Sequence, residues 1–224
     1  MRWLRDATGR FPRRPHYDEA ELEAVCADLL LELRQLRHPS DTAVSADDLS
    51  VLIEHHGADL DLFADLPAEF DGVTEFSRDA RPRVGVAERL ASHARSEHRL
   101  RTTLAHELAH VVLHNFIWWF TQGPDPSVPF DPAALSPRCA LRARAVDWME
   151  WQANYCAGAL LVPASELDAS GPVWERSTRG RALVRATQAR FDVSAQVATI
   201  RLRQLGRLSE RPLHVLRSPV PRRW

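Results

Sequence analysis

The sequence predicts an α+β protein that is mostly helical, with a small, mainly antiparallel sheet of about three strands packed on a central helix. Long segments in which apolar residues recur every three or four positions indicate amphipathic helices. Three short segments, 58–63, 70–76 and 83–87, have the apolar patterns of strands. The connections between these three segments are short, so we expect an antiparallel meander beside the helices.

Length and composition indicate one large domain, or one domain with appendages. The 224 residues are 45% hydrophobic, and the formal net charge of −1 gives no overall case for binding nucleic acid or an anionic membrane. All 29 cationic residues are Arg, and the three cysteines show no C-x-x-C spacing. Without a signal-peptide pattern or a run of 18 apolar residues, we expect a cytoplasmic protein with no membrane partner.

Changes in composition divide the chain into four expected regions. Residues 1–17 combine Pro12 and Pro15 with several arginines, which favours a flexible basic arm. The other regions are a core over 18–170 with a Pro-rich loop at 116–140, a pair of helices over 171–208 packed on that core, and a Pro- and Arg-rich tail over 209–224.

Two helices are expected before the first strand. The first covers 18–37, where apolar residues follow helical spacing, and Pro39 ends it. The second begins after Ser45, whose hydroxyl can cap it, and stops at Gly57, because Gly readily adopts the left-handed conformation at a helix end.

The strongest chemical signal is the pattern His106-Glu107-Leu108-Ala109-His110, in a segment without Gly or Pro. Residues four apart share one helix face, so His106 and His110 can direct two imidazoles at one zinc ion. Glu107 lies about 100° round the helix, from where it can reach a water on the metal as a general base. Because the helix is apolar nearly all round, these polar groups would be costly to bury unless they were paired or bound a metal.

Histidines also flank this motif. His93 and His98 lie in the charged stretch 88–99, where they could line a cleft or simply belong to a solvated approach to the helix. His114 lies a further turn beyond His110, too far from His106 to share one tetrahedral ion with it. We interpret it as a core histidine or as one that supports a ligand.

A loop rich in proline is expected after the motif helix. Residues 116–120 are strongly aromatic, and five prolines follow within 124–137. Such a loop could act as a lid or as an inhibitory plug. The aromatic cluster could form a wall of a substrate pocket or core under the loop, and Cys139 could occupy the open metal position in a latent state.

A helix over 141–161 supplies a third candidate ligand. Glu150 and Asn154 lie one turn apart and face the same way. The carboxylate of Glu150 can complete a tetrahedral site, and the amide of Asn154 can accept a hydrogen bond that fixes the tautomer of a ligand imidazole. The alternative is a solvent-facing polar pair, which the apolar neighbours Trp148 and Trp151 disfavour.

The last helices admit two interpretations. Ser194 can cap the second helix of a pair that stops at Gly206, and such a pair could form a DNA-binding helix-turn-helix. Packing on the core is favoured instead, because the sequence has no dense basic face beyond Arg201, Arg203 and Arg207.

Two motifs in this order resemble the ImmA/IrrE metallopeptidase family. They are RTTLAHELAHVVLH over 101–114 and EWQANYCAGALLVP over 150–163, and the stretch 191–206 is similar to the family's usual sequel. The resemblance implies a minimal zincin-like (gluzincin) fold with one catalytic Zn²⁺. It implies His106, His110 and Glu150 as ligands and Glu107 as the general base.

The resemblance also implies a protein substrate. This would be a helix-turn-helix (Xre-type) repressor encoded nearby, whose cleavage relieves repression in a stress response or during mobile-element induction. Tyr155, His93 and His98 are candidates for a further contact with the oxyanion or the substrate. The chain departs from the family's pattern at Ala109, often Gly, at Cys156, often Phe, and in the length between the motifs.

Three functions are therefore weighed. The first is a zinc endopeptidase, and the second is a non-cleaving metal-binding partner of a DNA-binding regulator or a toxin–antitoxin component. The third is a DNA-binding regulator that uses residues 181–206 and the Arg-rich termini. We expect the first, without direct binding to nucleic acid, because a ligand triad with an adjacent base exceeds what sequestration needs.

Overall fold

The computed structural model describes residues 1–7, 9–37, 43–78, 80–120, 148–169 and 180–208. This part of the chain is mostly helical with two small sheets, which confirms the predicted α+β class. Among these residues, no helix has the length and apolar character needed to cross a membrane. The Pro-rich loop beyond residue 120, with Cys139, and the tail at 209–224 lie outside the described residues.

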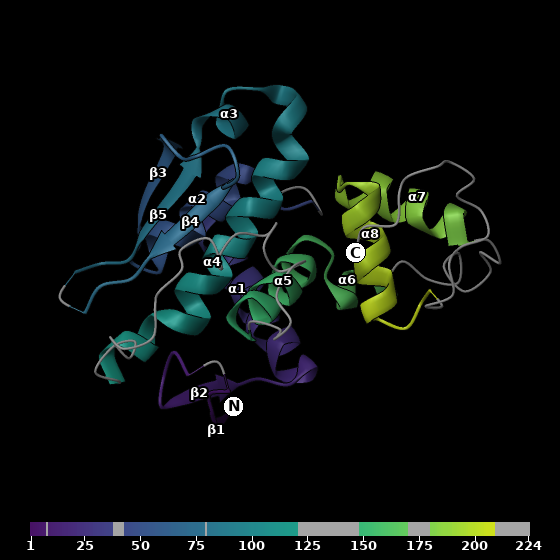
Figure 1. Ribbon diagram of the computed structural model, residues 1–224. Helices are drawn as coiled ribbons and strands as arrows, with labels where there is room; N and C mark the ends of the chain where they lie inside the picture. Colours follow the sequence, from purple (N-terminus) through teal and green to yellow (C-terminus); the bar gives the residue numbers. More distant parts are fainter. Residues whose placement is uncertain (8, 38–42, 79, 121–147, 170–179, 209–224) are drawn as a thin grey trace.

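The central helix lies between the three-stranded sheet and α5. Figure 1 shows α4 running between the three-stranded sheet on one side and α5, followed by α8, on the other. The strands are β1 (Arg2–Arg5), β2 (Arg13–His16), β3 (Asp59–Ala64), β4 (Gly72–Glu75) and β5 (Arg83–Ala87). The helices are α1 (Glu19–Arg37), α2 (Ala46–His55), α3 (Glu88–Ala91), α4 (Glu97–Phe120), α5 (Trp148–Leu161), α6 (Ala164–Asp168), α7 (Gly180–Phe191) and α8 (Ala195–Gln204), with a 3-10 turn at Ala94–Ser96.

The three-stranded sheet packs on α4 as expected, but it is not an antiparallel meander. Its order is β3-β5-β4, with β5 parallel to β3 and antiparallel to β4. Val84 and Val86 of β5 are 1% and 0% exposed, whereas β3 alternates between exposed and half-buried residues. The most buried strand is therefore the central one, where both of its edges are paired and its side chains pack on the helices. Connection length alone could not predict this insertion.

Helix α4 is longer than the sequence predicted. It continues through Phe120, so residues 116–120 are helical and do not begin a loop. Ile117 and Trp118 belong to a buried cluster with Phe11 and Trp148. Residues 116–120 contain neither Gly nor Pro, and two of their apolar side chains thus find partners in the core.

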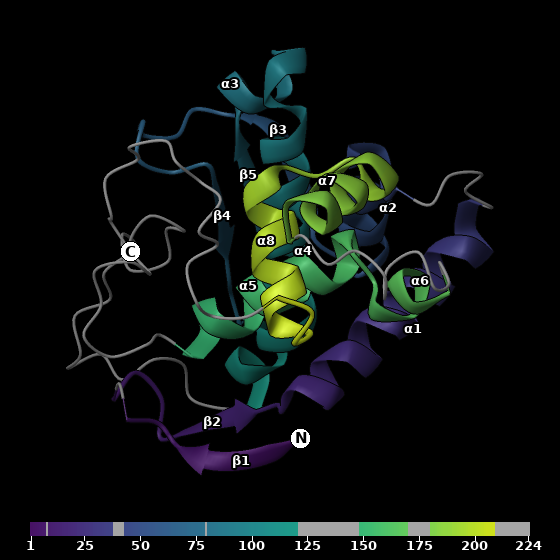
Figure 2. The same cartoon turned by 90° about the vertical axis from the view of Figure 1, so that its right-hand side faces the viewer.

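An antiparallel hairpin of β1 and β2 replaces the flexible arm expected for residues 1–17. Phe11, in the connection between the strands, is 2% exposed and packs edge-on against Trp118, with the ring centroids 5.1 Å apart. The buried carboxylate of Asp6 accepts hydrogen bonds from the Phe11 backbone N–H at 3.0 Å and from the indole of Trp148 at 3.1 Å. Trp118 and Trp148 lie more than 100 residues further along the chain, so the composition of residues 1–17 alone suggested a flexible arm. In Figures 1 and 2 the hairpin lies against one end of the helical body.

The caps of α2 agree with the sequence. The hydroxyl of Ser45 accepts a hydrogen bond from the backbone N–H of Asp48 at 3.1 Å, and the Asp48 carboxylate accepts one from the Ser45 N–H at 3.0 Å. Gly57 follows the helix with φ of +81°, in the left-handed region. The two reciprocal hydrogen bonds between Ser45 and Asp48 satisfy two backbone donors that the start of a helix otherwise leaves unpaired.

The C-terminal helices pack on the core through a buried arginine. Arg201 of α8 is fully buried; its Nε donates to the carbonyl of Val162 at 3.0 Å, and its Nη2 lies 2.7 Å from the carboxylate of Glu23 on α1. Ser194 caps α8, as predicted, by accepting a hydrogen bond from the Val197 N–H at 3.2 Å. Of the arginines on the two C-terminal helices, at least Arg201 is therefore used in packing on the core.

Candidate metal centre

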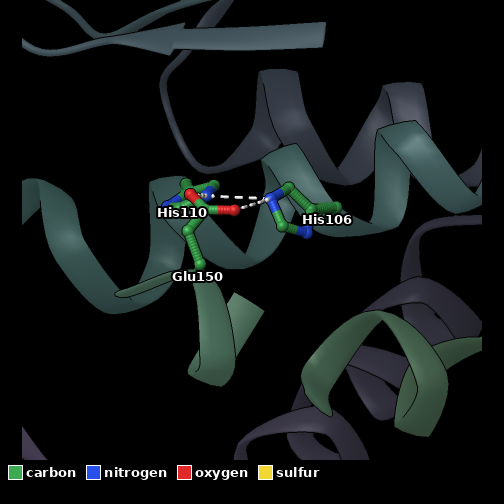
Figure 3. Close-up of side chains that lie close together, drawn as sticks. All are labelled: His106, His110 and Glu150. Carbon is green, nitrogen blue, oxygen red and sulfur yellow. Dashed lines mark hydrogen bonds and ion pairs between the residues drawn. The ribbon is translucent and has the colours of Figure 1, made fainter. Parts of the chain in front are cut away.

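Two packed helices bring the three predicted ligands together. His106 and His110 lie one turn apart on α4, and Glu150 reaches them from α5 (Figure 3). The two Nε2 atoms are 3.0 Å apart. The carboxylate oxygens of Glu150 lie 3.2 Å from Nε2 of His110 and 3.4 Å from Nε2 of His106. Among the described residues, these three side chains form the one group that could hold a metal ion, and all three are buried.

The spacing fits a tetrahedral ion. Ligand atoms at about 2.0–2.1 Å from zinc, at tetrahedral angles, lie roughly 3.3 Å from one another. The two Nε2 atoms are 3.0 Å apart, and each of them lies 3.2–3.4 Å from a different oxygen of Glu150. Neither oxygen of Glu150 accepts a hydrogen bond of normal geometry from the residues that the structure describes. A carboxylate and two imidazole nitrogens that converge in a buried site are suited to a cation. The triad, His106, His110 and Glu150, could therefore hold a metal ion.

Electrostatics keep the carboxylate of the triad charged. Burial by itself would raise the pKa of Glu150, but the imidazoles of His106 and His110 lower it to about 2. Burial likewise opposes a charge on His106, yet Glu150 and then Glu107 raise its pKa above the usual value. Glu150 is thus an anion at neutral pH, as a metal ligand must be.

Glu107 lies beside the triad and contacts the sheet. Its Oε2 accepts a hydrogen bond from the hydroxyl of Thr74 on β4 at 2.7 Å. A Cβ atom at Gly72 would lie 2.7 Å from Oε1 of Glu107 and 2.6 Å from Cγ2 of Thr103, so only Gly fits there without a shift. A small pocket at this point is lined by Val73, Thr74, Phe76, Glu107 and His110. The base predicted from the sequence is thus held between α4 and the backbone of β4.

A buried polar chain extends from the far side of His110. Its Nδ1 lies 3.0 Å from Nδ1 of His114, and Nε2 of His114 lies 3.0 Å from Oε1 of Gln152. The amide nitrogen of Gln152 donates to the carbonyl of Pro15 on β2 at 3.2 Å. Burial, followed by the proximity of His110, lowers the pKa of His114 well below its usual value, so this ring is neutral. His114 therefore supports a ligand, one of the two roles that the sequence left open.

The structure gives other partners to two of the remaining candidates. The hydroxyl of Tyr155 donates to Glu23 at 2.8 Å, and burial together with Glu23 raises its pKa to about 12. His98 is exposed and pairs with Asp192 at 3.0 Å. His93 is exposed, directly before the 3-10 turn. These contacts lend no support to an oxyanion or substrate role for the three residues.

Asn154 has a weaker link to the triad than the sequence predicted. Its amide contributes to the raised pKa of His106, after the larger effects of burial, Glu150 and Glu107. Nδ1 of His106 nevertheless has no hydrogen-bond partner among the described residues, and Asn154 is exposed. The supporting hydrogen bond from Asn154 to a ligand imidazole stays a prediction.

Sequence reasoning assigned no functional role to Gly72, Thr74 or Gln152. Thr74 and Gly72 acquire their roles only because β4 packs on α4. Gln152 offered one signal, a polar side chain in an apolar helix. That signal could not identify a partner, because a residue two positions after Glu150 points to a different side of the helix.

No protein-family model and no curated protein matches the sequence. Among solved structures, a Mycobacterium tuberculosis transcriptional regulator matches with a TM-score of 0.51 and 17% sequence identity. The match covers 82% of this chain and 46% of that chain, so this chain spans less than half the length of the regulator. At this identity the likeness concerns the fold alone.

Proposed function

We propose that the protein is a zinc-dependent endopeptidase of the ImmA/IrrE type with a zincin-like fold. One observation carries the proposal: His106, His110 and Glu150 converge at the spacing of a tetrahedral ion, while Glu107 stands beside them and outside the triad. Three protein ligands leave one position open, as in catalytic zinc sites, whereas structural sites use four.

Each residue then has a distinct task. Zinc, when bound, would act as a Lewis acid and lower the pKa of water in the open position to about 7. Glu107 accepts a proton from the attacking water and passes it to the leaving amine. The hydrogen bond from Thr74 to Oε2 of Glu107 holds the carboxylate in place and leaves lone pairs free for the proton transfer. Burial of the site strengthens these electrostatic interactions.

The position of β4 supports a peptide as the substrate. Among the described residues, β4 pairs with β5 along one edge, and no described strand pairs with its other edge. An extended peptide can add to such an edge through main-chain hydrogen bonds. Since Gly72 and Thr74 of β4 contact the side chain of Glu107, a peptide on this edge would pass close to the base.

The resemblance of the motifs supports a helix-turn-helix repressor encoded nearby as the substrate, with cleavage relieving repression. A second function, a metal-binding partner that holds a regulator without cutting it, is favoured by the burial of the centre. His106, Glu107, His110 and Glu150 are each at most 3% exposed, so a substrate reaches them only if the surroundings open.

The test is Glu107→Gln, assayed on the purified helix-turn-helix protein encoded beside the gene. Removing a general base typically slows catalysis about 10²- to 10⁴-fold, so we expect cleavage to fall by that factor while the zinc content stays at that of the wild type. Cleavage is followed on gels and by mass spectrometry, and zinc by elemental analysis.

Glu97→Gln is the matched control, because Glu97 is an exposed glutamate at the start of the same helix. It should cleave at the wild-type rate. Cleavage by Glu107→Gln at the wild-type rate would refute the proposed mechanism. A stable complex in which the wild-type protein leaves the repressor intact would favour the second function.

A further inference from the structure

The chain from His110 to Pro15 has only one consistent direction of hydrogen bonding. A proline has no backbone N–H, and its carbonyl can only accept, so the nitrogen of the Gln152 amide must face it. The amide oxygen then faces Nε2 of His114 and requires a proton there. A neutral His114 that is protonated on Nε2 presents a lone pair on Nδ1, and Nδ1 of His110 must donate to it.

This direction determines the state of the ligand atom. When Nδ1 of a neutral His110 carries the proton, Nε2 carries the lone pair. Nε2 is the atom that faces His106 and Glu150 in the triad, at 3.0 and 3.2 Å. The carbonyl of Pro15 thus sets, three hydrogen bonds away, which nitrogen of His110 is available to a metal.

Reversing the chain would create a buried mismatch. A flipped Gln152 would place its oxygen against the carbonyl oxygen of Pro15, two acceptors 3.2 Å apart. Both His114 and Gln152 are fully buried, so water does not replace the lost partner. A buried acceptor without a donor is costly, and this cost favours the observed direction.

The N-terminal hairpin holds the carbonyl of Pro15 in place relative to α4 and α5, the two helices that carry the triad. Asp6 accepts a hydrogen bond from Trp148 at the start of α5, at 3.1 Å. Phe11 packs on Trp118 near the end of α4 and on Trp148, with centroid distances of 5.1 and 6.4 Å. The carbonyl of Pro15 is therefore positioned by contacts with the helices that carry His110 and Glu150.

We propose that His114 and Gln152 are positioning residues that hold His110 in the tautomer with a free Nε2, with the carbonyl of Pro15 as the fixed end of the chain. The inference rests on the metal-binding part of the proposed function and is independent of peptide cleavage. Neither residue touches a substrate or a metal ion. Both act through the ring of His110.

The experiment compares three variants with the wild type in the full chain, and the residues exchanged or compared at each position are of similar size. His114→Asn keeps an acceptor near the position of Nδ1, whereas His114→Leu removes it. Gln152→Met keeps the volume of the side chain but removes both hydrogen bonds, with Gln152 itself as the reference. Zinc affinity is measured by competition with a chelating dye, and the unfolding free energy of each metal-free variant is measured in urea.

We expect His114→Leu and Gln152→Met to lose about 10- to 100-fold in zinc affinity, the usual effect of removing a residue that supports a ligand. His114→Asn should lose less zinc affinity than His114→Leu, because the hydrogen bond from His110 is retained although the one to Gln152 is lost. Equal zinc affinities for His114→Asn and His114→Leu would overturn the inference, and so would a loss that follows only the unfolding free energy.

The tautomer of His114 is measured directly by ¹H–¹⁵N correlation spectroscopy of the histidine rings. We expect a protonated Nε2 and an unprotonated Nδ1 on His114 in the wild type; the opposite tautomer would overturn the inference. This result is obtained with or without metal. A wild-type protein that binds no zinc would therefore defeat the proposed function, while the spectrum would still decide on the polar chain.

Discussion

Helix α5 borders two buried clusters of charged side chains, and the two differ in whether their charges are balanced from within. In the first, the triad, one carboxylate faces two imidazoles, and the three groups converge. In the second, which we call the Arg201 cluster (Glu23, Tyr155 and Arg201), a guanidinium pairs with a carboxylate at 2.7 Å, and the tyrosine hydroxyl donates to the same carboxylate.

The comparison separates a binding site from a structural contact. In the Arg201 cluster the positive charge of Arg201 meets the negative charge of Glu23, the guanidinium also donates to the carbonyl of Val162, and the Tyr155 ring lies 5.5 Å from it. In the triad, both carboxylate oxygens of Glu150 lack a hydrogen-bond donor among the described residues. Buried charge alone is therefore not a sign of function, whereas convergent acceptors without a matching donor are one.

The largest difference between the two clusters should appear in zinc affinity. Glu150→Gln removes an anionic ligand, and we expect zinc affinity to fall by more than about 100-fold, since even a residue that supports a ligand costs about 10- to 100-fold. Glu23→Leu should leave zinc affinity within about twofold. Competition titrations with a chelating dye measure both. Equal losses in the two variants would show that Glu150 is no more a metal ligand than Glu23.

The reverse difference should appear in stability. Glu23→Leu leaves Arg201 buried without its counter-charge, which should lower the free energy of unfolding by about 3 kcal/mol, the lower end for a broken buried pair. The lower end applies because the side chain of Glu23 is 28% exposed. Asp28→Leu, at an exposed position of the same helix, is the control and should change stability by less than about 0.5 kcal/mol. Urea denaturation of the metal-free variants measures these values, and an undiminished stability of Glu23→Leu would show that the pair is dispensable.

A smaller effect is expected where the sheet touches the base beside the triad. Gly72→Ala introduces a Cβ atom 2.6–2.7 Å from Thr103 and Glu107, so we expect a destabilisation of about 1–3 kcal/mol and slower cleavage. Gly85→Ala is the matched control on β5. There the added atom would lie 3.2 Å from the Cβ of Ala64, so the neighbouring atoms need to shift far less. The two variants are compared by urea denaturation and by the cleavage assay. Identical behaviour would mean that the contact between β4 and Glu107 is not specific.

The smallest effect concerns the alkaline titration of the Arg201 cluster. The chain has two tyrosines, so tyrosinate formation can be followed by ultraviolet absorbance with at most two titrating groups. Burial and Glu23 raise the pKa of Tyr155 to about 12, so its stabilising contribution is complete below about pH 10, the ordinary tyrosine pKa, and is lost as pH rises through about 12. In Glu23→Leu the tyrosinate of Tyr155 should form at a lower pH, and an unchanged midpoint would contradict the contact.

Much of the fold and most of the triad could be predicted because local patterns encode them. The three strand segments lie close to β3, β4 and β5, and the capping pattern at Ser45 and the stop at Gly57 place α2 within a residue or two. The pairing of the strands could not be predicted, since the position of β5 between β3 and β4 is decided by tertiary packing and not by the pattern within each strand. The hairpin of residues 2–16 was missed for the same reason: its partners on α4 and α5 lie more than 100 residues away.

The sequence by itself determined that His106 and His110 share a helix face with Glu107 beside them, because the spacing of an α-helix places them so regardless of the rest of the chain. It also marked Glu150 as the carboxylate on a second helix. Only the tertiary structure decided that β4 holds Glu107 through Thr74 and Gly72, and that His114 and Gln152 connect His110 to the carbonyl of Pro15. These contacts join three separate parts of the chain, and their partners are chosen by packing, which no local periodicity encodes.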